Sequence, residues 1–129
     1  MSWPLPSIAL VLSIVLLSGC VSHRPPSAAA QEFERLYSAW HYDFETEGDG
    51  SSNVHWEVGR PSYRNIVGMG KPALPFLKQK LEENKGPDCL LAFAVVEIYG
   101  WDAHEFWGAG YPKVQEFRTN VLRKMKANK

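Results

Sequence analysis

The feature that most constrains the fold is an apolar stretch at residues 88–100, which reads DCLLAFAVVEIYG. Between its first and last residues the one charged side chain is Glu97, so a helix formed here would be hydrophobic on every side. Such a helix belongs in the middle of a bundle, where other elements surround it. Val95 and Val96 would also suit a buried strand, but the length of the stretch and its leucine and alanine content favour a helix. The stretch therefore predicts the central helix of a small all-α bundle.

Four further segments show the apolar spacing of amphipathic helices. The first follows Ser27, a residue type that caps helix N-termini, and stops at the polar residues 47–53, EGDGSSN. The next two open at Pro61 and Pro72, and the last extends over residues 112–127. The residues expected to face the core are Phe33, Leu36, Tyr37, Trp40, Phe44, Tyr63, Ile66, Val67, Leu74, Leu77, Leu81, Val114, Phe117, Val121, Leu122 and Met125. The sequence thus predicts about five helices in a domain covering residues 31–129.

Residues 54–58, VHWEV, alternate between apolar and polar side chains, a pattern that also suits a short strand. A strand needs a second strand to pair its backbone groups, and no other segment of the chain offers one. We therefore expect a loop that packs through Trp56.

Residues 63–81, YRNIVGMGKPALPFLKQKL, resemble one HEAT-type helical repeat. The resemblance lies in a short helix, a glycine-containing turn and a second helix that opens with PALPFL. It implies two antiparallel helices, with the following two helices as a second, degenerate unit. Repeats of this kind need about three units to be stable alone, so one clear unit predicts a compact bundle rather than a long solenoid. The resemblance also implies the protein-binding habit of such repeats.

The N-terminal segment carries a ten-residue apolar run, residues 8–17, that ends close to a cysteine. Extended to residues 5–21 it covers 17 residues, the lower limit for a membrane-spanning helix. Leu17-Ser18-Gly19-Cys20 resembles the lipobox of bacterial lipoproteins, although residues 1–7 lack the usual positive side chain. The resemblance implies a signal peptide at residues 1–19, cleavage between Gly19 and Cys20, and a diacylglyceryl group on Cys20. An uncleaved signal anchor is the alternative.

Residues 20–30 contain Pro25, Pro26 and small side chains without an apolar face, which predicts a short tether. As a coil it would span about 15 to 20 Å between the lipid and the domain. The residue after Cys20 is Val21 rather than Asp. In bacteria with two membranes this resembles lipoproteins sent to the outer membrane, where the domain would face the periplasm.

Charge and cysteine content exclude several classes of partner. The chain has 14 Lys and Arg and 14 Asp and Glu, so no basic excess recruits nucleic acid. The cationic residues near the C-terminus, Arg123, Lys124, Lys126 and Lys129, suit the C-terminal end of a helix and form no polybasic membrane segment. The two cysteines, Cys20 and Cys89, are too few for a disulfide framework, and Cys89 in its apolar setting is expected to be a buried, unreactive thiol.

No catalytic set, metal site or cofactor is predicted. Residues 43–54 have the alternating acids of an EF-hand calcium loop, but the twelfth position, which needs a bidentate carboxylate, is Val54. Residues 68–71, GMGK, lack the first glycine and the Ser or Thr of a phosphate loop. His41 and His55 lie close in sequence to Asp43 and Glu57, but no nucleophile motif accompanies them.

Residues 101–112, WDAHEFWGAGYP, are rich in aromatic side chains. The preferred interpretation is that the rings close one end of the bundle. The alternative is an exposed protein-binding surface, because Trp and Tyr are enriched at binding hot spots. Acid–base chemistry by His104 with Asp102 or Glu105 is disfavoured, since residues so close in sequence do not face one another on a helix. The candidate protein-binding residues are Trp101, His104, Phe106, Trp107 and Tyr111.

Together these patterns predict a lipid-anchored domain of the bacterial cell envelope that binds another protein and is not an enzyme. The specific hypothesis is an immunity or exclusion factor that neutralises an incoming toxin or phage component. The alternatives are a structural lipoprotein of an envelope assembly and, less favoured, a small hydrolase-type enzyme. The oligomeric state does not follow from the sequence.

Overall fold

The computed structural model describes residues 2, 24–47, 54–108 and 113–129, and the predicted all-α bundle is confirmed. Five α-helices have eight or more residues, a sixth is short, and these ranges contain no strand. The α-helices are α1 (Ala28–Glu47), α2 (Val54–Val58), α3 (Pro61–Gly68), α4 (Leu74–Glu83), α5 (Leu91–Tyr99) and α6 (Val114–Ala127). Three 3-10 helices connect them: η1 (Lys71–Ala73), η2 (Gly86–Leu90) and η3 (Ala103–Phe106). None of the helices in the described ranges is both long and apolar enough to cross a membrane.

Helix α5 occupies the centre of the bundle, as its apolar composition predicts, and packs against α3, α4 and α6. The observed helix is shorter than the predicted one at its N-terminal end, because Asp88 and Cys89 belong to η2. Pro87 in this turn has no backbone N–H for a helix ladder, and Gly86 adopts a positive φ. Residues 86–90 form a 3-10 helix, and the α-helix starts only at Leu91. Its buried residues are Leu91, Ala92, Ala94, Val95 and Val96.

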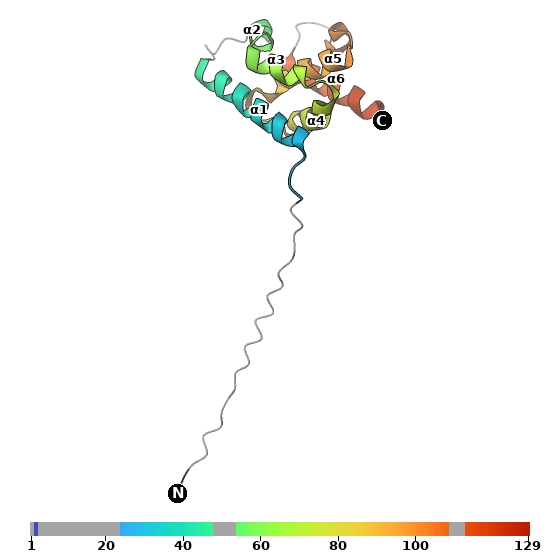
Figure 1. The fold of residues 1–129 in the computed structure, drawn as a ribbon. Helices are drawn as coiled ribbons and strands as arrows, with labels where there is room; N and C mark the ends of the chain where they lie inside the picture. The colour runs from blue at the N-terminus through green and yellow to red at the C-terminus, as the bar shows by residue number, and fades with distance from the viewer. Residues whose placement is uncertain (1, 3–23, 48–53, 109–112) are drawn as a thin grey trace.

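Helix α1 begins after Ser27, whose Oγ accepts a hydrogen bond from the backbone N–H of Ala30 at 3.1 Å. The predicted cap is confirmed, and residues 28–30, expected in the tether, belong to the helix. Figure 1 shows α1 running from its junction with residues 24–27 across the domain toward the side where α2 lies. It packs chiefly against α3 and buries Phe33, Leu36 and Trp40.

The segment Val54–Val58 is a short helix, so both the strand and the loop interpretations were wrong. In this helix Glu57 is buried and Trp56 is not, the reverse of what their polarity predicts. Glu57 Oε2 lies 3.0 Å from Nε of Arg60, and this pair has the three-residue spacing of one helical turn. Trp56 lies partly exposed on the outside.

Helices α3 and α4 cover the segment that resembles a HEAT unit. Between them Gly70 adopts a φ of 68°, a conformation that other residues rarely take. Pro72 then lies in η1, and α4 begins two residues later than predicted, with Pro75 in its first turn. Helix α3 packs mainly on α1 and α5, and α4 on α5 and α6. The helical content of this segment is confirmed, and its kinship with HEAT repeats stays a prediction.

Helix α6 closes the bundle over α5 and α4. It begins at Val114, two residues after the predicted start at Pro112, because Lys113 has an extended conformation and forms the N-terminal boundary. The residues that α6 buries are Phe117, Val121, Leu122 and Met125, as predicted, whereas Val114, which was also expected in the core, is only partly buried. The signal peptide and the lipidation position Cys20 lie outside the described residues.

Candidate functional site

The aromatic segment that follows α5 packs onto the end of the bundle. Trp101 lies parallel to Tyr99 with the ring centroids 4.1 Å apart, and Nζ of Lys124 lies 4.7 Å from the centroid of the Trp101 ring. The same Lys124 forms an ion pair with Glu105 at 2.8 Å. These contacts attach the segment to α6, so Trp101 presents only part of its surface.

The other rings of this segment are still less available. Phe106 is 3 % exposed and belongs to the core, and Trp107 packs against Phe93 and Phe117. His104 is exposed, and its backbone N–H bonds to Asp102 Oδ1 at 3.0 Å. Tyr111 lies outside the described residues. Of the four candidate binding residues that the structure describes, Phe106 is in the core and Trp101 and Trp107 are partly covered, and these rings close the end of the bundle.

A polar cluster that the sequence did not indicate joins α1 to η2. Asp88 is fully buried, and both of its carboxylate oxygens accept from the hydroxyl of Tyr37 at 2.8 Å. Nε2 of His41 lies 2.8 Å from Asp88 Oδ1. Burial, followed by the hydrogen bond to Asp88, raises the pKa of Tyr37, so its hydroxyl keeps its proton. The cluster links helices that are far apart in sequence.

The chemistry of this cluster fits a structural role better than catalysis. The adjacent thiol of Cys89 is half-buried, burial raises its pKa, and its Sγ lies 3.9 Å from the carbonyl oxygen of Pro87. A thiol held in its neutral form is a poor nucleophile. The described residues also contain no group of three or more His, Cys, Asp or Glu side chains placed to hold a metal ion.

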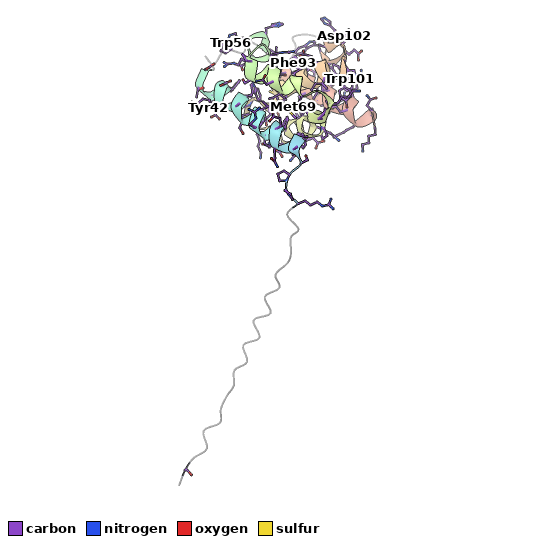
Figure 2. The ribbon with its side chains drawn as sticks, viewed as in Figure 1. Tyr42, Trp56, Met69, Phe93, Trp101 and Asp102 are labelled. Atoms are coloured by element: carbon purple, nitrogen blue, oxygen red, sulfur yellow. The ribbon has the colours of Figure 1, made fainter. Side chains whose placement is uncertain are left out.

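A second feature lies where the C-terminal end of α1 meets α2 and the start of α3. We call it the acidic aromatic corner, and Figure 2 shows two of its residues, Tyr42 and Trp56, on the side of the domain opposite Trp101. Tyr42 is 67 % exposed and Trp56 47 %, and they are the two exposed large hydrophobic residues of the described ranges. Glu47, His55, Trp56 and Arg60 line one hollow there, and Tyr42 and Glu45 precede Glu47 on the last turns of α1; we use the name for these six residues.

Arg60 organises this corner although it is only 6 % exposed. Its Nη1 lies 3.1 Å from Glu47 Oε2 and 3.3 Å from the carbonyl oxygen of Asp43. The guanidinium carbon lies 3.7 Å from the centroid of the Trp56 ring. Nη2 is buried without a hydrogen-bond acceptor. Beside this guanidinium is an open hollow of about 330 Å³, lined by Glu47, His55, Trp56, Gly59, Arg60 and Pro61.

The exposure of Tyr42 and Trp56 was not predicted from the sequence. Tyr42 lies outside the apolar period of α1, between His41 and Asp43, where a helix faces solvent. Trp56 was expected to pack inward and instead covers Arg60 from outside. An aromatic residue that falls outside the helical apolar period would have indicated Tyr42.

No protein-family model, no curated protein and no solved structure matches the chain.

Proposed function

We propose that this chain is a lipid-anchored envelope protein whose helical domain binds another protein at the membrane surface. The lipobox-like Leu17-Ser18-Gly19-Cys20 supports the anchor. Helix α1 starts at Ala28, which leaves residues 21–27 as the tether. A coil of this length spans about 15 Å, so the domain works close to the lipid. Val21 after Cys20 supports placement at an outer membrane, facing the periplasm.

The single observation that carries the binding role is the exposure of Tyr42 and Trp56 on the acidic aromatic corner. Tyrosine and tryptophan contribute more binding energy per residue at protein interfaces than most other side chains. Within the part of the domain that the structure describes, the other large apolar side chains are wholly or partly buried, and a tyrosine in water adds nothing to stability. Recognition of a partner explains this exposure.

Radioactive palmitate tests the anchor in cells that produce the full chain. The native chain should incorporate label and sediment with membranes, whereas Cys20→Ser should lose the label. Membrane release of Cys20→Ser is expected because one or more acyl chains supply the attachment, at about 0.8 kcal/mol for each buried methylene. Equal sedimentation of unlabelled Cys20→Ser would contradict lipid anchoring.

Photo-cross-linking in the same cells tests the binding role. A photoreactive residue at position 42 should give one discrete adduct with an envelope protein. The same residue at Ser38, exposed one turn earlier on α1, serves as the control. A further arm replaces Trp101, from the segment that the sequence favoured. Adducts from position 101 but not from position 42 would move the surface to that segment, and no adduct from any position would contradict the binding role.

A further inference from the structure

The exposed charges that lack an oppositely charged partner are unevenly distributed over the domain. Within residues 24–47, 54–108 and 113–129, the exposed cations without an ion pair are Arg24, Lys71, Lys113, Arg123, Lys126 and Lys129. The exposed acids without an ion pair in the same ranges are Glu45, Asp102 and Glu116. Because the opposite charges of an ion pair largely cancel at a distance, the unpaired residues determine the field that a partner meets.

Lys71 lies beside the N-terminal half of α1, because α3 runs back along that helix. At the start of α3, Arg60 pairs with Glu47 at the end of α1. One turn further along α3, the ring centroid of Tyr63 lies 5.7 Å from that of Trp40, which is nearer the start of α1. The turn η1 follows α3 and contacts α1 itself. The fold therefore carries Lys71 toward the N-terminal end of α1.

Helix α4 runs in the same direction as α1. The rings of Phe76 and Phe33 stack with their centroids 5.4 Å apart. One helical turn later on both helices, Nζ of Lys80 lies 4.2 Å from the centroid of the Tyr37 ring. The start of α4 therefore lies near the N-terminal end of α1, and η1 with Lys71 directly precedes it.

Helix α6 runs in the opposite direction to α4. The side chain of Asn84, just after α4, donates to Gln115 in the first turn of α6 at 3.1 Å. Further along α6, Nη1 of Arg118 donates at 2.8 Å to the carbonyl oxygen of Leu81, which is earlier on α4. The C-terminal end of α6 is therefore directed toward the start of α4. Figure 1 shows the C-terminus in the lower half of the domain, the half from which residues 24–27 extend.

The unpaired acids lie away from this end of the domain. Glu45 is in the last turn of α1, and Glu116 is in the first turn of α6. Asp102 follows α5, and Figure 2 shows it on the side of the domain opposite the point where the chain enters. Of the unpaired cations in the described ranges, Lys113 alone lies with the acids, because it precedes the first turn of α6. Unpaired positive charge is thus concentrated where α1 starts.

We call this surface the basic end, and its residues are Arg24, Lys71, Arg123, Lys126 and Lys129. We infer that the basic end rests on the anionic phospholipid headgroups of the membrane that holds the chain. This inference depends on the proposed lipid anchor and adds the orientation of the domain on the bilayer. No single run of the sequence indicates the surface, because its cations come from three separate parts of the chain.

Charge and chain length select a lipid surface as the occupant. Only residues 21–23 separate Arg24 from the proposed lipid on Cys20, and so short a segment spans at most about 14 Å. Lys and Arg side chains are attracted to an anionic bilayer within roughly one Debye length, about 8 Å at physiological salt. A tethered surface is already at high effective concentration beside the headgroups, so a weak attraction is enough to hold it there.

Amine acetylation of the full lipidated chain in vesicles tests the inference. The chain is reconstituted in phosphatidylcholine alone or with about one third phosphatidylglycerol, treated briefly with acetic anhydride and analysed by mass spectrometry. The ratio of acetylation at Lys71 to acetylation at Lys113 should fall at least about threefold when phosphatidylglycerol is present. Both lysines belong to the same chain, so the ratio cancels differences in reconstitution. High salt should restore the ratio, because it screens the attraction.

A matched pair of variants distinguishes a defined surface from general attraction. Lys126→Gln removes one charge from the basic end and should recover at least about half of the lost ratio. Lys85→Gln also removes one exposed lysine, but beside Asn84, which bonds to the start of α6. This control should leave the ratio unchanged within about 1.5-fold.

The anchor and the basic end fail in different ways. A chain that sediments with both kinds of vesicle but shows an unchanged ratio would overturn the basic end alone, and so would equal recovery in the two variants. Sedimentation with the anionic vesicles alone would contradict the anchor and support the basic end, whereas sedimentation with neither would contradict both. Protection of Lys71 in native membranes but not in anionic vesicles would overturn the inference and assign the surface to an acidic protein.

Discussion

At the scale of single residues, Asp88 holds the most demanding position in the domain. Its carboxylate is removed from water, and a buried charge is tolerated only when hydrogen bonds replace the lost solvation. Tyr37 and His41, one helical turn apart on α1, supply those bonds. The pair thereby fixes η2, and with it the start of α5, against α1.

Replacing Asp88 should therefore cost far more stability than replacing its partners. For Asp88→Ala we expect a loss of about 3 kcal/mol, because two partly buried polar groups, on Tyr37 and His41, lose their acceptor and a small void forms in the core. Tyr37→Phe keeps the ring and removes one donor, so about 1 kcal/mol is expected. Urea denaturation followed by circular dichroism measures both changes. Equal losses in the two variants would contradict the central position of Asp88.

Cys89 offers a second prediction at this scale. Burial raises the pKa of its thiol, so little thiolate forms near neutral pH. In a chain carrying Cys20→Ser, iodoacetamide at pH 8 should react with native Cys89 at least about tenfold more slowly than with the urea-denatured chain. Mass spectrometry follows the alkylation. Equal rates in the two states would show that Cys89 is accessible and reactive.

Such residue-level contacts mark the limit of prediction from this sequence. His41 was considered beside Asp43, two residues away, but on a helix the two side chains point in different directions. Its partner is Asp88, which becomes a neighbour only when η2 packs on α1. Trp56 was expected inside because it is large and apolar, whereas the ion pair of Glu57 with Arg60 turns it outward.

At the scale of elements, the glycines at the C-terminal ends of α3 and α5 differ in backbone conformation. Gly100 has a φ of 69° and Gly68 does not have a positive φ, and in both cases an added Cβ would meet no atom within 4 Å. Gly100→Ala should destabilise the domain by about 1 kcal/mol through backbone strain alone. Gly68→Ala should stabilise it by about 0.5 kcal/mol, because the unfolded chain loses freedom. Thermal unfolding of the two variants should show shifts of opposite sign.

A surface ion pair joins α3 to α5 and makes stability depend on pH. The hydrogen bond from Arg64 lowers the pKa of Glu97 below its ordinary value of 4.5. The stabilisation is therefore complete above pH 4.5 and is lost as the pH falls through the lower, folded-state pKa. Both side chains are nearly half exposed, so we expect only about 0.5 kcal/mol after screening by water.

A double-mutant cycle measures this pair. Glu97→Gln and Arg64→Met should each reduce the difference in unfolding free energy between pH 6 and pH 3.5, and the double variant should reduce it no further. Additive effects of the two substitutions would show that they act independently.

Elements were predictable where one physical signal dominated. The apolar period of α1, α4 and α6 and the apolar composition of α5 locate these helices, and a serine cap and prolines place their starts to within two or three residues. Helix α2 was missed because five residues hold little more than one turn, too short for a period of 3.6 to be distinguished from an alternation of two. The ion pair between Glu57 of α2 and Arg60 determines which side of this helix is buried, and the apolar spacing alone does not reveal it.

At the scale of the whole molecule, the position of α1 separates the end of the domain that adjoins residues 24–27 from the end that carries the acidic aromatic corner. The N-terminal end of α1 adjoins the tether, and the acidic aromatic corner lies at the other end of this helix (Figure 1). A helix of 20 residues is about 30 Å long. The corner thus lies at the end of α1 that is farther from the proposed lipid on Cys20.

The domain should fold without the residues that precede its first cap. Residues 24–26 supply one contact to the helices, the carbonyl oxygen of Pro26 that accepts from Gln31, whereas Ser27 caps α1 and Phe33 is in the core. A chain beginning at Ser27 should therefore unfold within about 0.5 kcal/mol of the full chain carrying Cys20→Ser. A chain beginning at residue 41 lacks Phe33, Leu36 and Trp40 and should not fold cooperatively, because each large core side chain contributes several kcal/mol. Thermal circular dichroism separates these outcomes, and an unfolded chain from Ser27 would mean that the N-terminal segment is part of the fold.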